Sequence, residues 1–489
     1  MKTFVNTRRS GVRRCLAGAL LFAAPLLAAP SAPAADHVAG SLIRLNDNGG
    51  WSWFEDERAV VDARAGKILV SSVANAAGRE GEARDGDVDV VAYDMASGEV
   101  TRFTLNRPRS DNRGWADDHN SAALWVRPDG RYVAMYSRHG GDRYSRWRVS
   151  DAAGEIGGWS PEQVLDNGAS TTYSNLYYLA GLQASGGTLY NFTRSTNFNP
   201  NLLASRDFGQ TWSYGGRLLT QGDGRQRPYV RYSSDSHRIH FITTEQHPRN
   251  FDNSIYHGYV EDGKLYNSVG APADADLFDA SAAAPRDLTC VFAAGVQFDG
   301  APMRHAWTID VEIDRRGQPY AVFQARANGR DEDHRFFYAR FDGQKWRVHQ
   351  LAKAGGYLYE RENDYTGLAA LDPDDPDRVV VSTKVDPRSE QPTARYELYQ
   401  GITGDGGASW SWTPITSDST VDNLRPVVPK WSDRRRALLW LRGHYATYTR
   451  YDLSVVGVID GEQTASGRPE VQAARPAGVN VAGGDRPVP

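Results

Sequence analysis

The sequence predicts an all-β fold, a seven-bladed β-propeller built from four-stranded blades. Three observations favour this fold: helical periodicity is rare, short β-rich runs alternate with turn signals, and the runs recur at close to the ~40–50 residues of one blade. The composition agrees, because 48 Gly suit tight turns while 13 Trp and 24 Tyr suit pairing between short strands. A β-sandwich or a β-helix is the alternative.

The recurring element is a β-rich run that follows a turn. In the clearest case, residues 121–126 and 131–137 flank Arg127-Pro128-Asp129-Gly130, which predicts a strand, a tight turn and a strand. Later runs of the same kind are residues 188–193, 238–243, 319–325, 378–383 and 437–443. They divide the chain into seven units, with approximate limits 50–108, 118–166, 172–220, 225–271, 301–356, 359–420 and 421–460. We expect one propeller domain over residues 36–460, because a single unit cannot bury both of its faces.

Two segments fit the Asp-box pattern S-x-D-x-G-x-T-W. Residues 205–212 match it fully, and residues 403–410 are a looser copy. In this motif the Asp and Gly shape a hairpin between outer strands, and the Trp packs between blades. The boxes therefore favour a propeller and say little about chemistry.

Both ends of the chain are predicted to lie outside the propeller. Residues 1–35 combine early arginines, an apolar run from Leu16 to Ala29 and small residues at 32–34, which is the plan of a secretory signal peptide. Paired arginines suggest twin-arginine export, with the general secretory route as the alternative. We therefore expect a secreted or periplasmic protein. Residues 461–489, rich in Ala, Gly, Pro and Arg, are predicted to be a poorly ordered tail.

Charge and cysteine content exclude several classes of function. The net charge of −4 gives no electrostatic case for nucleic acid, and no segment after the signal is apolar enough to span a membrane. One cysteine, Cys290, remains after processing, so neither a disulfide framework nor a cysteine-based zinc cluster can form. We expect a monomer that binds neither nucleic acid nor membrane.

Polar residues at the starts of the units should gather at one mouth of the central channel. They include Asp117 to Asn120, Thr172 to Asn175, Arg227 to Tyr229, His305 to Trp307 followed by Asp310, Asn363 to Tyr365, and Asn423 to Pro426. A ring of His, Tyr and Arg is what a polar binding site needs. Arg227-Pro228 and Arg425-Pro426 look like copies of one position.

The sharpest pair is His119 and His139. Each lies ten residues from Asp129, the centre of the predicted turn, so the two should face each other across the hairpin. Paired imidazoles titrate near neutrality and can move protons or bind a metal. Two ordinary strand-end histidines are the alternative.

The third unit repeats this arrangement with other residues. Tyr173 takes the place of His119, and Arg194 returns on the next strand, while Tyr177 and Tyr178 lie deeper on the strand of Tyr173. Arg194 can clamp a substrate carboxylate with its planar fork, or can pair with an acid of its own blade.

With these residues the chain resembles the secreted BNR-repeat propellers that include ulvan lyases and rhamnose–glucuronate lyases. The resemblance runs from about Trp51 to Val455 and rests on the Asp-boxes, the His119/His139 hairpin, residues 171–179 and Arg194. It implies β-elimination at a uronic acid of an acidic polysaccharide, with His119, His139, Tyr173 and Arg194 as catalytic residues. Which of Tyr173, Tyr177 and Tyr178 is the catalytic tyrosine stays open, as does the division of labour between the histidines.

The resemblance also implies residues for further sugar or sulfate groups. Tyr178, Arg227, His305 and Arg425 are the predicted substrate-binding residues, and Trp51, Trp53 and Trp307 are candidate stacking platforms or core residues. Elimination requires no cofactor. Acids and histidines at the mouth leave a structural calcium or zinc ion open, although no three ligands at fixed spacing are visible.

Two other functions compete with the lyase. A sialidase-like glycoside hydrolase needs paired carboxylates or a Tyr–Glu pair, for which Asp117, Asp118, Asp310 and Asp364 are available. The sequence has no Arg-Ile-Pro segment of the sialidase type near the predicted mature N-terminus. A non-catalytic carbohydrate-binding propeller would explain the aromatic residues but has no need of two facing histidines.

Overall fold

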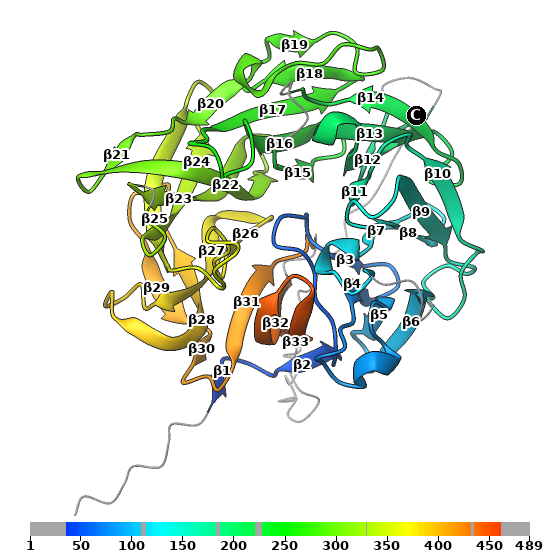
Figure 1. Ribbon diagram of the computed structural model, residues 1–489, viewed down its shortest axis with the longest axis horizontal. Coiled ribbons are helices and arrows are strands. Elements are labelled where there is room, and N and C mark those ends of the chain that lie inside the picture. The colour runs from blue at the N-terminus through cyan, green and yellow to red at the C-terminus, as the bar shows by residue number, and fades with distance from the viewer. Residues whose placement is uncertain are drawn as a thin grey trace, which may run out of the picture. The chain divides into compact units, whose positions relative to one another are not determined.

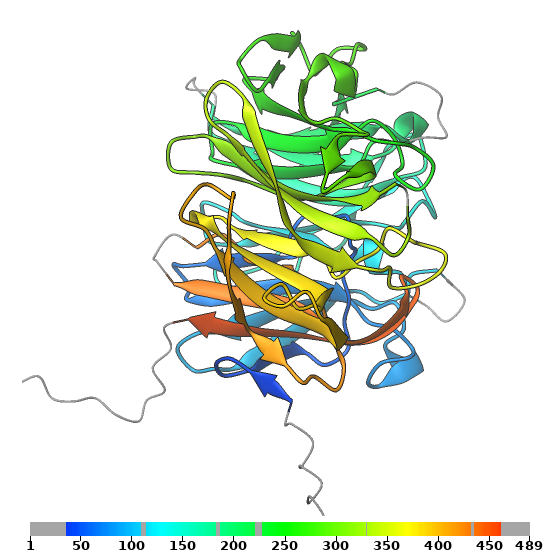
Figure 2. The same cartoon turned by 90° about the vertical axis from the view of Figure 1, so that its left-hand side faces the viewer.

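The computed structural model describes residues 36–108, 114–181, 186–220, 227–328, 330–431 and 435–460. They form seven antiparallel blades around a central axis, which confirms the predicted propeller (Figure 1); Figure 2 shows the same ring from the side. The helical elements among these residues are four 3₁₀ turns, η1 (Gly81–Ala83), η2 (Asp118–Asn120), η3 (Thr196–Phe198) and η4 (Pro285–Asp287).

Blades 1, 2, 3 and 6 are four-stranded, and from blade 1 to blade 7 the innermost strand of each blade contacts that of the next. Blade 1 comprises β3 (Ala59–Asp62), β4 (Lys67–Val73), β5 (Val88–Asp94) and β6 (Val100–Asn106). Blade 2 comprises β7 (Ala123–Val126), β8 (Tyr132–Ser137), β9 (Tyr144–Val149) and β10 (Gln163–Asp166). Blade 3 comprises β11 (Thr172–Leu179), β12 (Thr188–Arg194), β13 (Pro200–Ser205) and β14 (Ser213–Arg217). Blade 6 comprises β26 (Ala369–Asp372), β27 (Asp375–Val385), β28 (Pro392–Ile402) and β29 (Ser411–Pro414).

Blades 4 and 5 carry extra strands beyond the predicted four. Blade 4 comprises β15 (Val230–Ser234), β16 (Ile239–Thr244), β17 (Ile255–Glu261), β18 (Lys264–Asn267), β19 (Pro272–Asp274) and β20 (Thr289–Phe292), the last of which pairs with β17. Blade 5 comprises β21 (Gln297–Phe298), β22 (Ala301–Ile313), β23 (Pro319–Ala327), β24 (His334–Phe341) and β25 (Trp346–Gly355). These additions broaden the outer part of the ring and leave its inner strands in place.

Blade 7 closes the ring with a strand from the other end of the chain. Its β31 (Asp422–Val427), β32 (Arg436–Thr447) and β33 (Arg450–Asp460) are completed by β2 (Ile43–Asn46), which pairs with β33. The short β1 (His37–Val38) pairs with β30 (Thr416–Ser417). The predicted units began at about residue 50, so they missed this closing strand.

The Asp-boxes have the structural role that their sequence predicts. Between β13 and β14, Asp207 accepts hydrogen bonds from Ser205 Oγ at 2.8 Å and from the backbone N–H of Thr211 at 2.9 Å. Gly209 has a φ of +84°, which favours glycine at this tight bend. Trp212 is buried in a cluster that joins blades 2 and 3. The looser box forms the equivalent hairpin between β28 and β29 through Asp405.

The central channel is filled by residues 51–58, which we call the plug. Figure 1 shows this blue segment, between β2 and β3, in the middle of the ring. Phe54 stacks on Trp307 of blade 5 with ring centroids 3.5 Å apart, and Trp53 Nε1 donates to the Thr366 carbonyl ahead of blade 6 at 2.6 Å. Asp56 accepts from the Tyr177 hydroxyl of blade 3 at 2.8 Å. The plug therefore touches blades that are far apart in the sequence.

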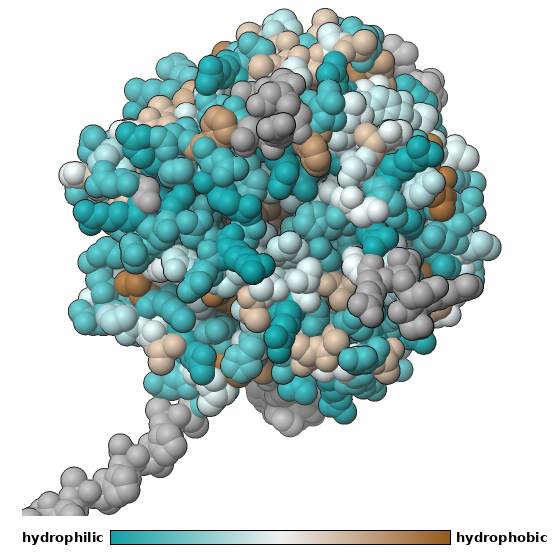
Figure 3. Space-filling view, viewed as in Figure 1, coloured by the Kyte–Doolittle hydropathy of each residue, from teal (hydrophilic) through white to brown (hydrophobic). Residues whose placement is uncertain are grey.

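The candidate stacking platforms are core residues that pack within or around the plug. Trp51, Trp53 and Trp307 are buried in the central core and cannot stack on a sugar. The face seen in Figure 3 is largely hydrophilic, with hydrophobic residues scattered among polar ones. The predicted signal peptide and tail lie outside the described residues. None of the described helices is long and apolar enough to cross a membrane.

Candidate active site

The candidate site lies where the inner strands of blades 2, 3 and 4 begin. His119 is in η2, just before β7, and His139 follows β8. The register of this hairpin pairs Ala123 with Met135, and continuing it by four residues places His119 opposite His139. The two imidazoles stack with centroids 3.9 Å apart and planes 10° from parallel, so the predicted facing pair is confirmed.

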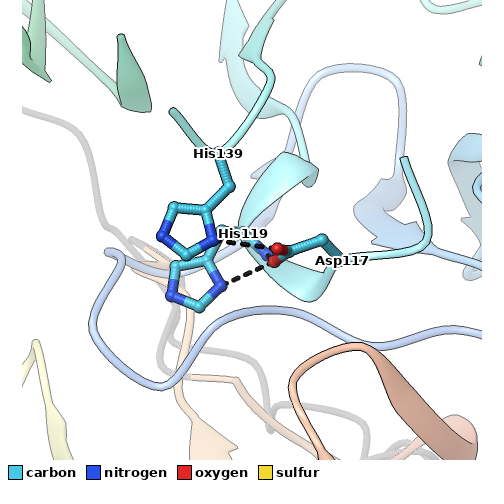
Figure 4. Close-up of side chains that lie close together, drawn as sticks. All are labelled: Asp117, His119 and His139. Atoms are coloured by element: carbon cyan, nitrogen blue, oxygen red, sulfur yellow. Dashed lines mark hydrogen bonds and ion pairs between the residues drawn. The ribbon is translucent and has the colours of Figure 1, made fainter. Parts of the chain in front are cut away.

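A single carboxylate holds both imidazoles. Asp117 Oδ1 lies 2.8 Å from His119 Nδ1, and Asp117 Oδ2 lies 2.8 Å from His139 Nδ1 (Figure 4). Asp118 Oδ1 is also 2.8 Å from His119 Nδ1. The backbone N–H of His139 donates to Asn120 Oδ1 at 2.7 Å, which ties the end of β8 to η2.

These carboxylates give the two histidines different charges. Burial lowers the pKa of His119, but the charges of Asp117 and Asp118 outweigh it and raise that pKa well above its usual value. Burial and the neighbouring His119 charge lower the pKa of His139 to about 4. Burial would raise the pKa of Asp117, but the two histidines lower it overall. At neutral pH the pair is therefore one imidazolium stacked on one neutral imidazole.

Asp117, His119 and His139 also have the composition of a metal site, with ligand atoms within 4.8 Å of one another. The geometry suits a shared hydrogen-bond acceptor better. Because the rings are stacked and nearly parallel, their Nδ1 atoms point side by side toward the carboxylate and do not converge on one point about 2.0–2.1 Å from each, as zinc requires.

On blade 3, Arg194 and Tyr173 come together at the end of β12 and the start of β11. Arg194 Nη1 donates to the Tyr173 hydroxyl at 3.3 Å, and its guanidinium lies 4.6 Å from the ring centroid. A register shift in β11 and a φ of +70° at Tyr173 turn this tyrosine away from the regular ladder. Its ring is 5.8 Å from His119. No carboxylate among the described residues pairs with the buried Arg194, so the alternative of a partner within its own blade is wrong.

Blade 4 adds Tyr229, which also lies close to Arg194. The Arg194 guanidinium is 5.6 Å from the Tyr229 ring, and Arg227 hydrogen bonds to the Tyr229 hydroxyl. Burial raises the pKa of Tyr229, but Arg227 and Arg194 outweigh it and lower that pKa to about 7. For Tyr173, burial outweighs Arg194 and raises the pKa to about 12.

Sequence reasoning missed two residues of the site, His247 and Tyr448, and placed a third, Tyr229, at the mouth without giving it a role. His247, in the loop after β16, has its ring 5.1 Å from that of Tyr229. Tyr448, in the hairpin of blade 7, lies edge-on to both stacked histidines at 5.3 and 5.7 Å. Tyr229 follows the noted Arg227-Pro228 pair, so its position at a strand start was a usable signal. The sequence around His247 and Tyr448 contains no motif that predicts their position at the site, because they reach it only when the blades close into a ring.

Three predicted substrate-binding residues are engaged in other contacts. Tyr178 packs against Trp125 and Phe208, with centroids 5.5 and 5.8 Å away, and lines a separate hollow of about 380 Å³ toward the other ends of the inner strands. His305 has both ring nitrogens engaged, with the Pro248 carbonyl at 2.6 Å and Asp252 at 3.1 Å.

Arg425 is buried beneath the mouth and belongs to the plug contacts. Its guanidinium donates to the Glu55 and Ser52 carbonyls at 2.6 and 3.3 Å, and burial lowers its pKa to about 9. Its φ of +50°, at a register shift in β31, corresponds to the bulge at Tyr173. Arg425 therefore occupies the position that Tyr173 has in blade 3, and the proposed equivalence with Arg227 is wrong. Arg227 does lie at the site.

The carboxylates considered for hydrolysis do not form a facing pair. Asp117 and Asp118 are adjacent and hold His119, and Asp118 also accepts from the Tyr445 hydroxyl at 2.7 Å. Asp310 accepts from the backbone N–H of Leu371 at 2.8 Å. Asp364 pairs with Arg326 at 2.7 Å. All four are buried.

Comparisons with known proteins agree with the fold. Residues 82–354 match the profile described as BNR repeat-containing family member. A polysaccharide lyase PL25 ulvan lyase, solved bound to -[GlcA(1-4)Rha3S]-, is 13% identical, covers 86% of this chain and 95% of its own, and has a TM-score of 0.60. Polysaccharide lyase Uly1 is 12% identical, with coverage of 86% and 99% and a TM-score of 0.53. An α-L-arabinofuranosidase from Fusarium graminearum is more distant, at 14% identity, coverage of 72% and 95%, and a TM-score of 0.42. These solved structures are carbohydrate-active enzymes, and no curated protein sequence matches the chain.

Proposed function

The chain belongs to the BNR repeat-containing family, and from the geometry of its site we propose that it is a polysaccharide lyase. It cleaves the bond to the C4 oxygen of a uronic acid by β-elimination. One observation carries this proposal: Arg194 and Arg227 have no carboxylate partner among the described residues, both lie beside Tyr229, and Arg194 also lies beside Tyr173. Unpaired arginines beside two phenols fit an anionic substrate and a proton transfer.

The first task of a uronate lyase is to neutralise the substrate carboxylate. The C5 proton next to that carboxylate is barely acidic while the carboxylate is negative. Arg194 and the imidazolium of His119 supply fixed positive charge for it in a buried place where charges act strongly. Asp117 and Asp118 offset the imidazolium, so the two arginines are the cations that face the Tyr229 phenolate and remain for an anionic substrate group.

The second task is to move two protons. Tyr229 is the base, because its pKa of about 7 gives a phenolate near neutral pH, and a base acts best when its pKa is close to the working pH. It takes the C5 proton, the electron pair forms the C4–C5 double bond, and the bond from C4 to its oxygen breaks. Tyr173 keeps its proton, since its pKa is about 12, and donates it to the leaving oxygen.

The substrate class that we propose is a rhamnose–glucuronate polymer of the ulvan type. Two observations support it: the fold is shared with a lyase solved with -[GlcA(1-4)Rha3S]-, and Arg227 provides a second cation for another anionic group. Residues 1–35 would direct export to where such polymers occur. The presence of the protein in culture medium, with an N-terminus near Asp36, would test the export step.

The deciding experiment is ultraviolet absorbance during incubation with uronate polysaccharides, ulvan and gum arabic first. Elimination leaves a conjugated double bond, so absorbance should rise. Arg194→Ala should lower the rate by about 10²–10³-fold or more, as expected for loss of a preorganised cation, and His139→Ala should also lower it. Arg206→Ala and His237→Ala, which change exposed residues, should leave it unaltered.

Other outcomes separate the competing functions. New reducing ends without absorbance would mean hydrolysis and would refute the lyase. Binding of the polymer without cleavage would indicate a carbohydrate-binding propeller.

A further inference from the structure

The arrangement at blade 2 places one carboxylate against two imidazoles. Asp117 uses Oδ1 for His119 and Oδ2 for His139, each at 2.8 Å, and it contacts the Nδ1 atom of both rings. Asp117 is itself fixed, because its Oδ1 accepts the backbone N–H of His119 at 3.1 Å at the start of η2. The proposed elimination gives this aspartate no proton to move and no substrate group to hold, because both of its oxygens are engaged by the histidines.

We propose that Asp117 is the positioning residue of the site: by accepting an N–H from both Nδ1 atoms, it fixes both histidine tautomers and turns both Nε2 atoms to the same side. The proposal rests on the proposed function for its catalytic consequence. Its structural content, two rings protonated at Nδ1, can be measured without any substrate.

The direction of the Nε2 atoms follows from the stacking. The rings are 3.9 Å apart and nearly parallel, and both Nδ1 atoms face Asp117. Figure 4 shows the other nitrogen of each ring side by side on the edge away from the carboxylate. An ionised carboxylate only accepts hydrogen bonds, so each Nδ1 must carry its proton.

The two rings then differ in what they present to the substrate. His119 contacts two carboxylates, Asp117 and Asp118, whereas His139 contacts Asp117 alone and lies near the positive Arg194. The additional proton therefore belongs to His119. His119 presents an N–H at Nε2 and can hold the substrate carboxylate, while His139 presents a lone pair and accepts a hydrogen bond from a sugar hydroxyl.

The first test is nuclear magnetic resonance of the whole protein with ¹⁵N-labelled histidine. At neutral pH we expect His139 to be protonated at Nδ1 alone and His119 to be protonated at both Nδ1 and Nε2. The variants His119→Gln and His139→Gln would assign each histidine signal to its residue. If His139 in the wild-type protein is neutral and carries its proton at Nε2, the proposal is wrong, and no Asp117 variant is needed to show it.

The second test is Asp117→Asn. An amide can accept from one Nδ1 with its oxygen, but its NH₂ group must face the other ring, which then has to become an acceptor at Nδ1 and carry its proton at Nε2. We expect that tautomer change in the spectrum, together with a fall in kcat of about 10²–10⁴-fold and a small change in KM. Asp166→Asn, which alters an exposed acid of the same blade, should change neither.

The two readouts separate the two proposals. Tautomers that stay unchanged in Asp117→Asn, in a protein that still unfolds cooperatively, would refute the role of Asp117 whatever the activity. A wild-type protein with the expected tautomers but with no lyase activity would refute the proposed function and leave the role of Asp117 in setting the tautomers intact.

Discussion

Tyr173 and Tyr229 contact the same guanidinium, yet their hydroxyl groups have opposite tendencies to ionise. Both are buried, and burial alone raises the pKa of a phenol. Tyr229 has a second cation, Arg227, at its hydroxyl, and this brings its pKa down to about 7. Burial of Tyr173 outweighs the charges of Arg194 and His119, and its pKa is raised to about 12. One additional arginine thus separates a base from an acid.

This contrast predicts the pH dependence of the reaction. On a polymer that the wild type cleaves, kcat/KM should increase with pH through about pH 7, because the phenolate of Tyr229 is the active form and is lost by protonation below that pH. Tyr229→Phe should lower kcat by about 10²–10⁴-fold, whereas Tyr266→Phe, in an outer strand of the same blade, should have no effect. Tyr173→Phe should lower kcat, but kcat/KM of this variant should still increase with pH through about pH 7. A rate that decreases from pH 6 to pH 8 would contradict the assignment of Tyr229.

Among the elements, the plug determines how the site is supported from below. Phe54 stacks on Trp307 and also meets the Tyr229 ring edge-on at 5.8 Å, so the plug contacts a residue of the site directly. Glu55 accepts from Ser121 Oγ at 3.0 Å, close to η2. A segment that precedes the first blade therefore supports residues of blades 2 and 4.

We expect Phe54→Ala to destabilise the protein by about 3–5 kcal/mol, the usual cost of removing a buried aromatic ring. Denaturant titration followed by tryptophan fluorescence would measure this change. Phe278→Ala, which truncates a ring that is 38% exposed, is the matched control and should cost much less. A loss below about 1 kcal/mol for Phe54→Ala would mean that the channel repacks around the cavity and that the plug is not a rigid support.

For the whole molecule, the ring is closed by residues from opposite ends of the described chain. β2 supplies the fourth strand of blade 7, and Leu45 is buried there. The four residues of β2 cover one edge of blade 7, because without them the backbone edge of β33 would be left unpaired.

A chain that starts at Asp47 should therefore unfold at a lower temperature than one that starts at Asp36, with a loss of at least about 3 kcal/mol from the burial of Leu45 and the lost pairing. A chain of residues 36–460 should keep the thermal stability and activity of residues 36–489, since we propose that the propeller ends near residue 460. Differential scanning calorimetry would measure the first comparison. Equal melting temperatures for the chains starting at Asp36 and Asp47 would show that β2 does not close the ring.

The sequence by itself determined the features that depend on neighbours in the chain. The seven units, the Asp-box hairpins and the meeting of His119 with His139 follow from local turns and the two-residue period of a strand, so spacing predicts them. Tyr173 and Arg227 were found in the same way, from positions at strand starts, and Arg194 from its position at the end of the strand that returns beside Tyr173.

Only the tertiary structure decided which strand starts face the site and what charge they meet there. Arg425 and His305 are at strand starts too, but one binds the plug and the other binds a neighbouring loop. The pKa of Tyr229, the approach of Tyr448 and the closure by β2 all join residues that are far apart in sequence. No periodicity encodes such contacts, because they exist only once seven blades have closed around a segment from the N-terminal end of the propeller.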